Sequence, residues 1–283
     1  MTTAIDVKLS PIPGPKVLLL GGTGTGKTHC IRTLFDAGFR HVSVLFTEPG
    51  MEVLGDIPPE KLSWHYIPPG TASWETTISQ LKKINTLSFE ALAKLSDMDK
   101  RQYTQFIDLY STLANFVDDR TGRALGPVDS WGTDHALAID SLSGVNLMAM
   151  KLVTGGKPVK SQADWQVAMD NVEQLLTKIT TDVRTTVVML AHMEREADEL
   201  TGGTQIMVST LGRKLAPRIP RFFSDCIHVK REGDRFTWST ATTNTDLKSR
   251  SLKIADNLPP SFKPLMEAWL ARGGIFETEP PAT

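Results

Sequence analysis

The chain has 283 residues, of which 40% are hydrophobic and 22% charged, and its formal net charge is −1. This composition is typical of a globular protein with a sizeable core, and it favours one large domain with an insertion over two equal domains. A net charge near zero excludes a global field that attracts nucleic acid or membrane, so any such binding needs a local patch.

The beginning of the chain lacks the charged and then apolar pattern of a secretion signal. No apolar run approaches the length of a membrane span, so we expect a cytoplasmic protein without a membrane partner. Residues 1–15 contain three prolines and are interpreted as an N-terminal arm. The two cysteines, Cys30 and Cys226, are most simply small core residues.

Residues 16–20 (KVLLL) predict a buried strand, and residues 29–37 predict a helix that Gly38 closes. Between them the chain reads G-x-x-x-x-G-K-T, and strand, glycine-rich loop and helix together are the context of a phosphate-binding P-loop. Loop amides and the N-terminus of the helix would cradle phosphate oxygens. Lys27 would reach the β- and γ-phosphates and the Thr28 hydroxyl would hold Mg²⁺, so ATP and Mg²⁺ are the predicted cofactors. The residues expected to bind the nucleotide are Gly21, Gly22, Thr23, Gly24, Thr25, Gly26, Lys27, Thr28 and His29.

Residues 41–47 (HVSVLFT) predict a second strand, which Glu48-Pro49-Gly50 ends abruptly. A carboxylate at this position could polarise the water that attacks the γ-phosphate. The alternative is a solvated Glu48 in a turn.

Residues 64–67 predict a short strand and residues 74–84 a helix. From about 85 to 130 the sequence is polar, with apolar residues at loosely helical spacing, and it is interpreted as a helical insertion. Residues 118–135 contain three glycines and a proline and are predicted to be a loop.

Residues 136–139 (ALAI) predict a strand that ends in Asp140, the position of a Walker B aspartate that holds Mg²⁺. The alternative is a carboxylate that starts a turn or caps a helix. Residues 161–183 give the clearest helix, with apolar side chains at steps of three and four residues and a capping box of Ser161 and Asp164.

Residues 186–191 predict another strand, and His192 follows it, where a polar side chain can contact the γ-phosphate and report hydrolysis. A lone histidine is more often an ordinary surface or core residue. Residues 226–240 predict a hairpin. Lys248 and Arg250 follow it and could act as a finger in a neighbouring subunit's nucleotide site, although Lys-x-Arg is common by chance.

A last helix is predicted at 262–270 and a flexible tail at 277–283. Strands that alternate with helices predict an α/β fold with a mostly parallel central sheet, helices on both faces and a C-terminal β-hairpin. Ligands of such sheets bind beyond the carboxyl ends of the strands.

The order of these motifs, from the P-loop to Lys-x-Arg, resembles the RecA core of RecA-type recombinases, KaiC-like ATPases and ring-shaped replicative helicases. Ile139-Asp140-Ser141 resembles their Asp-Ser pair, and the match covers roughly residues 16–255. The chain looks closest to small phage-encoded nucleotide-binding proteins, some linked to single-strand annealing and recombination. The resemblance implies a RecA-like P-loop NTPase domain over 16–276, in the host cytoplasm if the protein is phage-encoded. It also implies a homo-oligomer, ring or filament, with nucleotide at its interfaces. The residues to which it gives catalytic or metal-binding roles are Lys27, Thr28, Glu48, Asp140, His192, Lys248 and Arg250.

Residues 194–212 are predicted to be a loop, and residues 212–231 carry six basic side chains against one acid, Asp225, a local balance of +5. In RecA-like proteins the loops here touch single-stranded DNA, and basic residues would make such binding salt-dependent. The alternatives are a solvated basic face or a subunit contact, and stacking aromatic residues are sparse. The predicted DNA-binding residues are Arg213, Lys214, Arg218 and Arg221.

The sequence therefore predicts a Mg²⁺-dependent ATPase that acts on single-stranded DNA in recombination, annealing or replication. One alternative is a small-molecule or nucleotide kinase, for which Arg120 and Arg123 could serve an acceptor. The other is a KaiC-like nucleotide-gated scaffold whose turnover DNA leaves unchanged.

Overall fold

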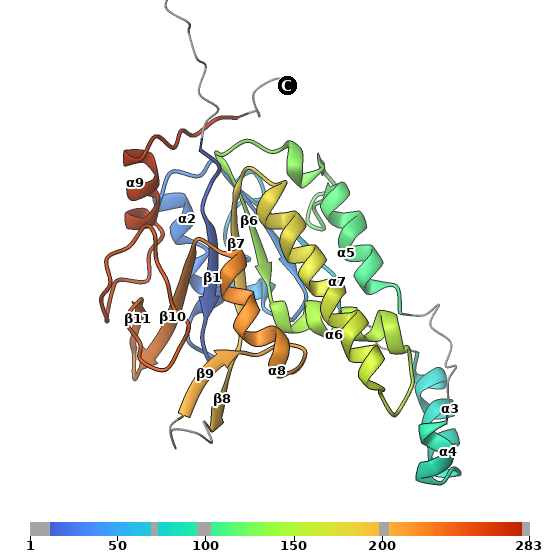
Figure 1. The fold of residues 1–283 in the computed structure, drawn as a ribbon. Helices are drawn as coiled ribbons and strands as arrows, with labels where there is room; N and C mark the ends of the chain where they lie inside the picture. Colours follow the sequence, from blue (N-terminus) through green and yellow to red (C-terminus); the bar gives the residue numbers. More distant parts are fainter. Residues whose placement is uncertain (1–11, 69–72, 95–102, 198–203, 279–283) are drawn as a thin grey trace, which may run out of the picture.

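The computed structural model describes residues 12–68, 73–94, 103–197 and 204–278. Their centre is a seven-stranded sheet with helices on both faces, as the sequence predicts (Figure 1). The strand order is β11-β10-β1-β7-β6-β2-β3, and every neighbouring pair is parallel except β10 and β11. These strands are β1 (Lys16–Leu20), β2 (His41–Phe46), β3 (Leu62–Tyr66), β6 (His135–Asp140), β7 (Thr186–Ala191), β10 (Asp225–Glu232) and β11 (Arg235–Ser239).

Each face of the sheet has its own hydrophobic core. Leu18 and Leu20 of β1 pack on one side, and Val17 and Leu19 pack on the other, as the period of two of a strand requires. Because both faces are covered, the strand is apolar throughout. The first core lies under α5 (Gln105–Ala114), α6 (Leu142–Thr154) and α7 (Gln162–Thr181), and the second under α1 (Lys27–Cys30), α2 (Thr33–Asp36) and α9 (Lys263–Ala271).

The register of the parallel strands decides which loops meet. Phe46 of β2 lies opposite Asp140 of β6, Asp140 lies opposite Leu190 of β7, and Ala191 lies opposite Leu20 of β1. The segments that follow these four strands therefore emerge side by side at the carboxyl edge of the sheet.

Two helices show what the sequence pattern could and could not indicate. The predicted helix at 161–183 is α7, and its capping box of Ser161 and Asp164 is present. Helix α6 has no counterpart in the sequence-based interpretation. Most of its length is buried, including Val145 and Met148, so it lacks the polar face that gives a helix its period.

The segment predicted as a helical insertion contains α4 (Phe89–Ala93) and α5, but part of it is extended. Residues 116–126 form a small hairpin of β4 (Phe116–Val117) and β5 (Ala124–Gly126), where the sequence predicts helix and then loop. A turn in which the Gly122 amide donates to the Asp118 carbonyl closes the hairpin. A 3-10 helix, η2 (Val128–Ser130), follows.

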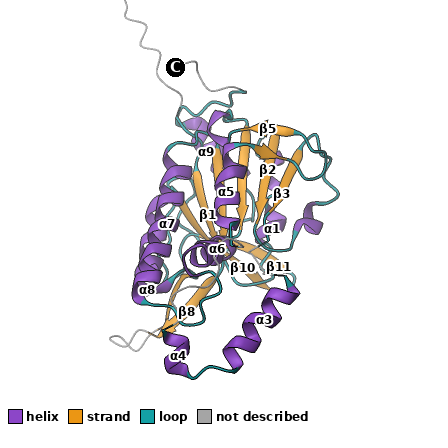
Figure 2. Cartoon of the chain, turned by 90° about the vertical axis from the view of Figure 1, so that its right-hand side faces the viewer, coloured by secondary structure: helices purple, strands orange, loops and turns teal. Residues whose placement is uncertain are grey.

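Two segments project from the carboxyl edge of the sheet (Figures 1 and 2). One is α3 (Trp74–Asn85) with α4. The other is a hairpin of β8 (Met193–Ala197) and β9 (Thr204–Val208), where the sequence predicts a loop. Residues 194–196 (ERE) are all charged, so the apolar alternation that marks a half-buried strand is missing. Shorter elements are η1 (Met51–Leu54), α8 (Gly212–Leu215) and η3 (Ala216–Phe222).

Both ends of the described chain are tied to the body. The Pro13 carbonyl accepts a hydrogen bond from Trp269 Nε1 at 3.0 Å, and the Glu277 amide donates to Thr133 Oγ1 at 2.8 Å. The rest of the predicted arm and tail, residues 1–11 and 279–283, lies outside the described residues. Among the described helices, none is both long and apolar enough to cross a membrane.

Candidate active site

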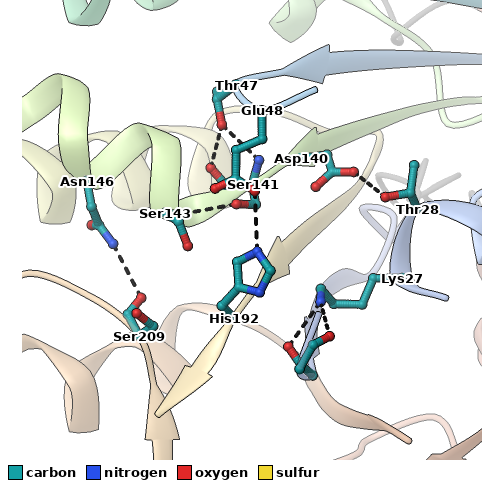
Figure 3. Close-up of polar contacts among 12 residues, drawn as sticks. Lys27, Thr28, Thr47, Glu48, Asp140, Ser141, Ser143, Asn146, His192 and Ser209 are labelled. Atoms are coloured by element: carbon teal, nitrogen blue, oxygen red, sulfur yellow. Dashed lines mark hydrogen bonds and ion pairs between the residues drawn. The ribbon is translucent and has the colours of Figure 1, made fainter. Parts of the chain in front are cut away.

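The P-loop joins β1 to α1 at the carboxyl edge of the sheet. Gly24 and Gly26 have φ angles of 73° and 86°, a backbone conformation that residues other than glycine rarely adopt. The Lys27 ammonium folds back over the loop and donates to the carbonyls of Gly21 at 3.0 Å and Gly22 at 2.8 Å (Figure 3). The P-loop thus curls around the ammonium group of its own lysine.

Thr28 and Asp140 meet across 112 residues of sequence. The Thr28 hydroxyl donates to Asp140 Oδ2 at 2.6 Å. A hydroxyl and a carboxylate are the hard oxygen ligands that Mg²⁺ prefers, and Mg²⁺ commonly completes its shell with water and substrate phosphates. Within the described ranges no group of three or more His, Cys, Asp or Glu side chains could hold a metal. The Thr28 hydroxyl and the Asp140 carboxylate therefore fit Mg²⁺ that arrives with a nucleotide.

Charge couples the residues of this edge. Burial lowers the pKa of Lys27, while the nearby carboxylates of Asp140 and Glu48 raise it. Burial raises the pKa of Asp140, and the Thr28 hydrogen bond opposes this shift. Lys27 and Asp140 thus share one electrostatic site, as a phosphate-and-metal site requires.

Glu48 and His192 face one another from the ends of β2 and β7 (Figure 3). His192 Nε2 lies 3.3 Å from Glu48 Oε2, and both side chains are about a third exposed. The hydrogen bond with His192 lowers the pKa of Glu48, as does one from Ser141, so the carboxylate is ionised at neutral pH.

Thr47 fixes the end of β2 to the end of β6. Its hydroxyl accepts from the Ser141 amide and donates to the Ser141 carbonyl, both at 2.8 Å. Gly144 makes room for it, because a Cβ there would overlap Thr47. The sequence analysis missed Thr47, although its place between a strand and Glu48 is a usable signal. These two hydrogen bonds connect the neighbour of Glu48 to the neighbour of Asp140 and so help to position the two carboxylates.

The P-loop from Thr23 onward, together with Glu48, Asp140 and His192, lines one pocket of about 880 Å³. Its phosphate end holds Lys27, Thr28, Glu48, Asp140 and His192. The pocket also extends to Phe236 and Pro260, from β11 and the loop before α9, which sequence reasoning did not single out. The full lining is Thr23, Gly24, Thr25, Gly26, Lys27, Thr28, His29, Cys30, Thr33, Glu48, Pro49, Val53, Asp140, His192, Phe236 and Pro260.

The family of the chain follows from comparison with known proteins. The AAA domain family matches residues 13–251. The chain belongs to this family. It is therefore a P-loop ATPase, a nucleotide-binding enzyme that hydrolyses ATP.

Other comparisons are more distant, and no curated protein matches the chain. A solved structure of a prototypical ATPase from the type III secretion system of pathogenic bacteria is similar, with 12% identity and a TM-score of 0.36. The match covers 77% of this chain and 52% of that one, so the ATPase spans about half the length of that protein.

Lys248 and Arg250 lie away from the P-loop of their own chain. The Lys248 carbonyl accepts from the Cys226 amide at 2.7 Å, and the Arg250 amide donates to Asp225 Oδ1 at 3.0 Å. Asp225 pairs with Val17, at the amino edge of the sheet, whereas the P-loop follows the carboxyl end of β1. Neither residue lines the pocket around the P-loop of its own chain.

Part of the predicted DNA-binding charge is neutralised by an acid on α7. Arg218 and Arg221 both contact Glu173 Oε1, at 3.2 and 3.5 Å. Lys214 is exposed, and the side chain of Arg213 lies outside the described part of the structure. The local excess of positive charge in the sequence is thus smaller in the folded ATPase.

Proposed function

We propose that the ATPase hydrolyses Mg²⁺-ATP with Glu48 as the base that orients and deprotonates the attacking water. The contact between Glu48 and His192, beside the Thr28–Asp140 pair, is the observation that carries this proposal. An ionised carboxylate can accept the proton of water, and general bases contribute about 10²- to 10⁴-fold to rates. Thr28 and Asp140 would hold Mg²⁺, whose positive charge would stabilise the charge that develops on the phosphates. Lys27 would leave its glycine carbonyls for the phosphates.

His192 would sense the γ-phosphate, because a phosphate beside Glu48 competes for the same ring nitrogen. His192 immediately precedes β8, and its carbonyl accepts from the Ser209 amide at 2.9 Å, at the base of the β8–β9 hairpin. A movement of His192 would therefore be transmitted to this hairpin.

The hairpin in turn contacts the segment of the proposed trans finger. The Ile206 amide donates to the Asn244 carbonyl at 2.7 Å, and Thr245 Oγ1 donates to the Ile206 carbonyl at 3.1 Å. If the protein forms a ring or filament in which Lys248 and Arg250 reach a neighbour's nucleotide, these bonds would couple that segment to the nucleotide state of its own chain.

Single-stranded DNA is the partner we propose for the surface that follows the hairpin. Lys214, Arg218 and Arg221 lie on α8 and η3, directly after β9, and one carboxylate, Glu173, contacts two of them. DNA phosphates could replace Glu173 as the acceptor for these guanidinium groups.

The test is ATP hydrolysis with and without single-stranded DNA across a salt series. We expect stimulation that weakens as salt rises, and Arg218→Ala with Arg221→Ala should reduce the salt slope of binding by about two. Lys61→Ala with Lys263→Ala, two exposed lysines elsewhere, is the control. Turnover that DNA leaves unchanged at every salt would favour the nucleotide-gated scaffold instead.

The kinase alternative has less support. Arg120, which could serve an acceptor, donates to the carbonyls of Ile57 at 2.7 Å and Leu62 at 3.1 Å and lies over the Trp64 ring. Release of phosphate without any acceptor would separate hydrolysis from phosphoryl transfer.

A further inference from the structure

The nucleotide pocket extends to an apolar wall that the phosphate chemistry does not use. Phe236 lines this part of the pocket and remains 39% exposed, although it is a large hydrophobic side chain. Pro260 lines the pocket from a second segment of the chain. An exposed aromatic ring inside a ligand pocket is a candidate contact for an apolar or aromatic part of the ligand.

Contacts with Arg231 and with the P-loop hold the Phe236 ring in place. Phe236 pairs across the hairpin with Arg231, whose guanidinium carbon lies 5.2 Å from the ring centroid. Arg231 is itself held by the carbonyls of Gly233 at 2.8 Å and Gly24 at 3.5 Å. On the P-loop, a Cβ at Gly26 would lie 3.0 Å from the ring, so glycine there lets the ring approach closely. The ring is therefore oriented before any ligand binds.

The segment that carries Pro260 is equally fixed. The Phe262 amide donates to Thr33 Oγ1 at 3.1 Å, and Leu258 and Trp238 exchange two backbone hydrogen bonds of 2.8 Å. Phe236 thus lies in β11, and the segment that carries Pro260 is anchored to both β11 and α2.

The polar groups near this wall offer little to the edge of a base. The Thr33 hydroxyl is already occupied, because it also donates to the Cys30 carbonyl at 2.8 Å. The Cys30 thiol is buried and contacts the Lys27 carbonyl. Apart from Lys27 and Thr28, which face the phosphate site, His29 is the other polar side chain that α1 and α2 contribute to the pocket. Stacking tolerates every base, whereas discrimination needs hydrogen bonds to base edges.

We propose that Phe236 is the stacking platform for the nucleobase, with Pro260 on the same wall, and that the site binds adenine and guanine nucleotides with similar affinity. This inference deepens the proposed function and depends only on its nucleotide-binding part. It needs neither DNA nor a second subunit.

The experiment measures the equilibrium binding of three Mg²⁺-loaded probes by calorimetry: the non-hydrolysable analogues AMP-PNP and GMP-PNP, and tripolyphosphate, which has no base. Phe236→Leu should weaken both nucleotide analogues by about tenfold or more, since base–aromatic stacking contributes that much, and should leave tripolyphosphate within about twofold. Phe236→Tyr should restore nucleotide affinity. Phe89→Leu, in α4 and 73% exposed, is the matched control and should change none of the three.

Several results would overturn the proposal. They are unchanged nucleotide affinity in Phe236→Leu, an equal loss of tripolyphosphate, no rescue by tyrosine, or a wild-type preference for one base above about 100-fold, which would require edge recognition. Because the readout is binding, a failure of hydrolysis or of DNA stimulation would count against the proposed function and leave this measurement intact.

Discussion

Two buried lysines at the two ends of β1 resemble each other closely. Lys16 begins the strand and Lys27 follows it after the P-loop, and each is 7% exposed. Each ammonium binds two backbone carbonyls: those of Val183 and Thr185 for Lys16, and those of Gly21 and Gly22 for Lys27. Burial and hydrogen bonding therefore do not tell the two apart.

Their electrostatic surroundings do. Burial alone lowers the pKa of Lys16 to about 7. At Lys27 the carboxylates of Asp140 and Glu48 oppose the effect of burial, and the side chain faces a large pocket. Nearby carboxylates and an open pocket thus distinguish a phosphate-binding lysine from a structural one. Lys16 is structural, because it binds the start of β1 to the segment before β7.

The largest expected effect separates the two lysines directly. Lys27→Met should abolish hydrolysis and weaken ATP binding by about 10- to 100-fold, because a charged donor to phosphate is lost. Lys16→Met, the matched control, should bind ATP like the wild type. Calorimetry and phosphate release measure both effects, and unchanged ATP affinity in Lys27→Met would remove the P-loop assignment.

The next effect tests whether Arg250 of a neighbouring subunit adds positive charge to the nucleotide site, as Lys27 does within the chain. Arg250→Ala should bind ATP but lose about 10³-fold in turnover if it is a trans finger. Mixed with Glu48→Gln protein, it should recover up to about a quarter of wild-type activity, because some head-to-tail interfaces then combine two intact halves. Steady-state hydrolysis at several mixing ratios measures this. Without any recovery, the trans role of Arg250 would be lost.

A smaller effect tests the carboxylate that acts on Lys27. Glu48→Gln preserves shape and should reduce turnover by about 10²-fold while ATP binding is retained, since the general base is removed. Glu52→Gln, on the exposed side of η1, is the control. If Glu48→Gln hydrolysed ATP at the wild-type rate, another group would have to activate the water.

Local pattern was sufficient for much of the fold and for the centre of the site. The apolar runs before Asp140 and His192 predicted parallel strands, and parallel strands must bring their carboxyl ends to one edge. The structure places both residues, with Lys27 and Glu48, around one pocket. Their catalytic roles remain predictions.

What the sequence left out depends on contacts between distant residues. Glu173, which neutralises Arg218 and Arg221, lies 45 and 48 residues before them, so no local charge count includes it. Phe236 reaches Gly26 only because β10 pairs with β1. Helix α6 lacked a signal for the opposite reason: its burial is too complete to leave a polar face.

The smallest effect returns to Lys16 and concerns stability instead of catalysis. Because the folded state lowers its pKa to about 7 from 10.5, the unfolded chain binds more protons between these values, and stability should rise with pH across this window. Below about pH 7 the buried ammonium is charged and its penalty is complete, at most about 5 kcal/mol. Lys16→Met should remove this slope, which urea unfolding at pH 6.5, 8 and 9.5 would measure, with Lys61→Met as the exposed control. If the variant kept the wild-type slope, the two carbonyls would hold the Lys16 ammonium charged throughout. Lys16 and Lys27 would then differ only in the pocket that Lys27 faces.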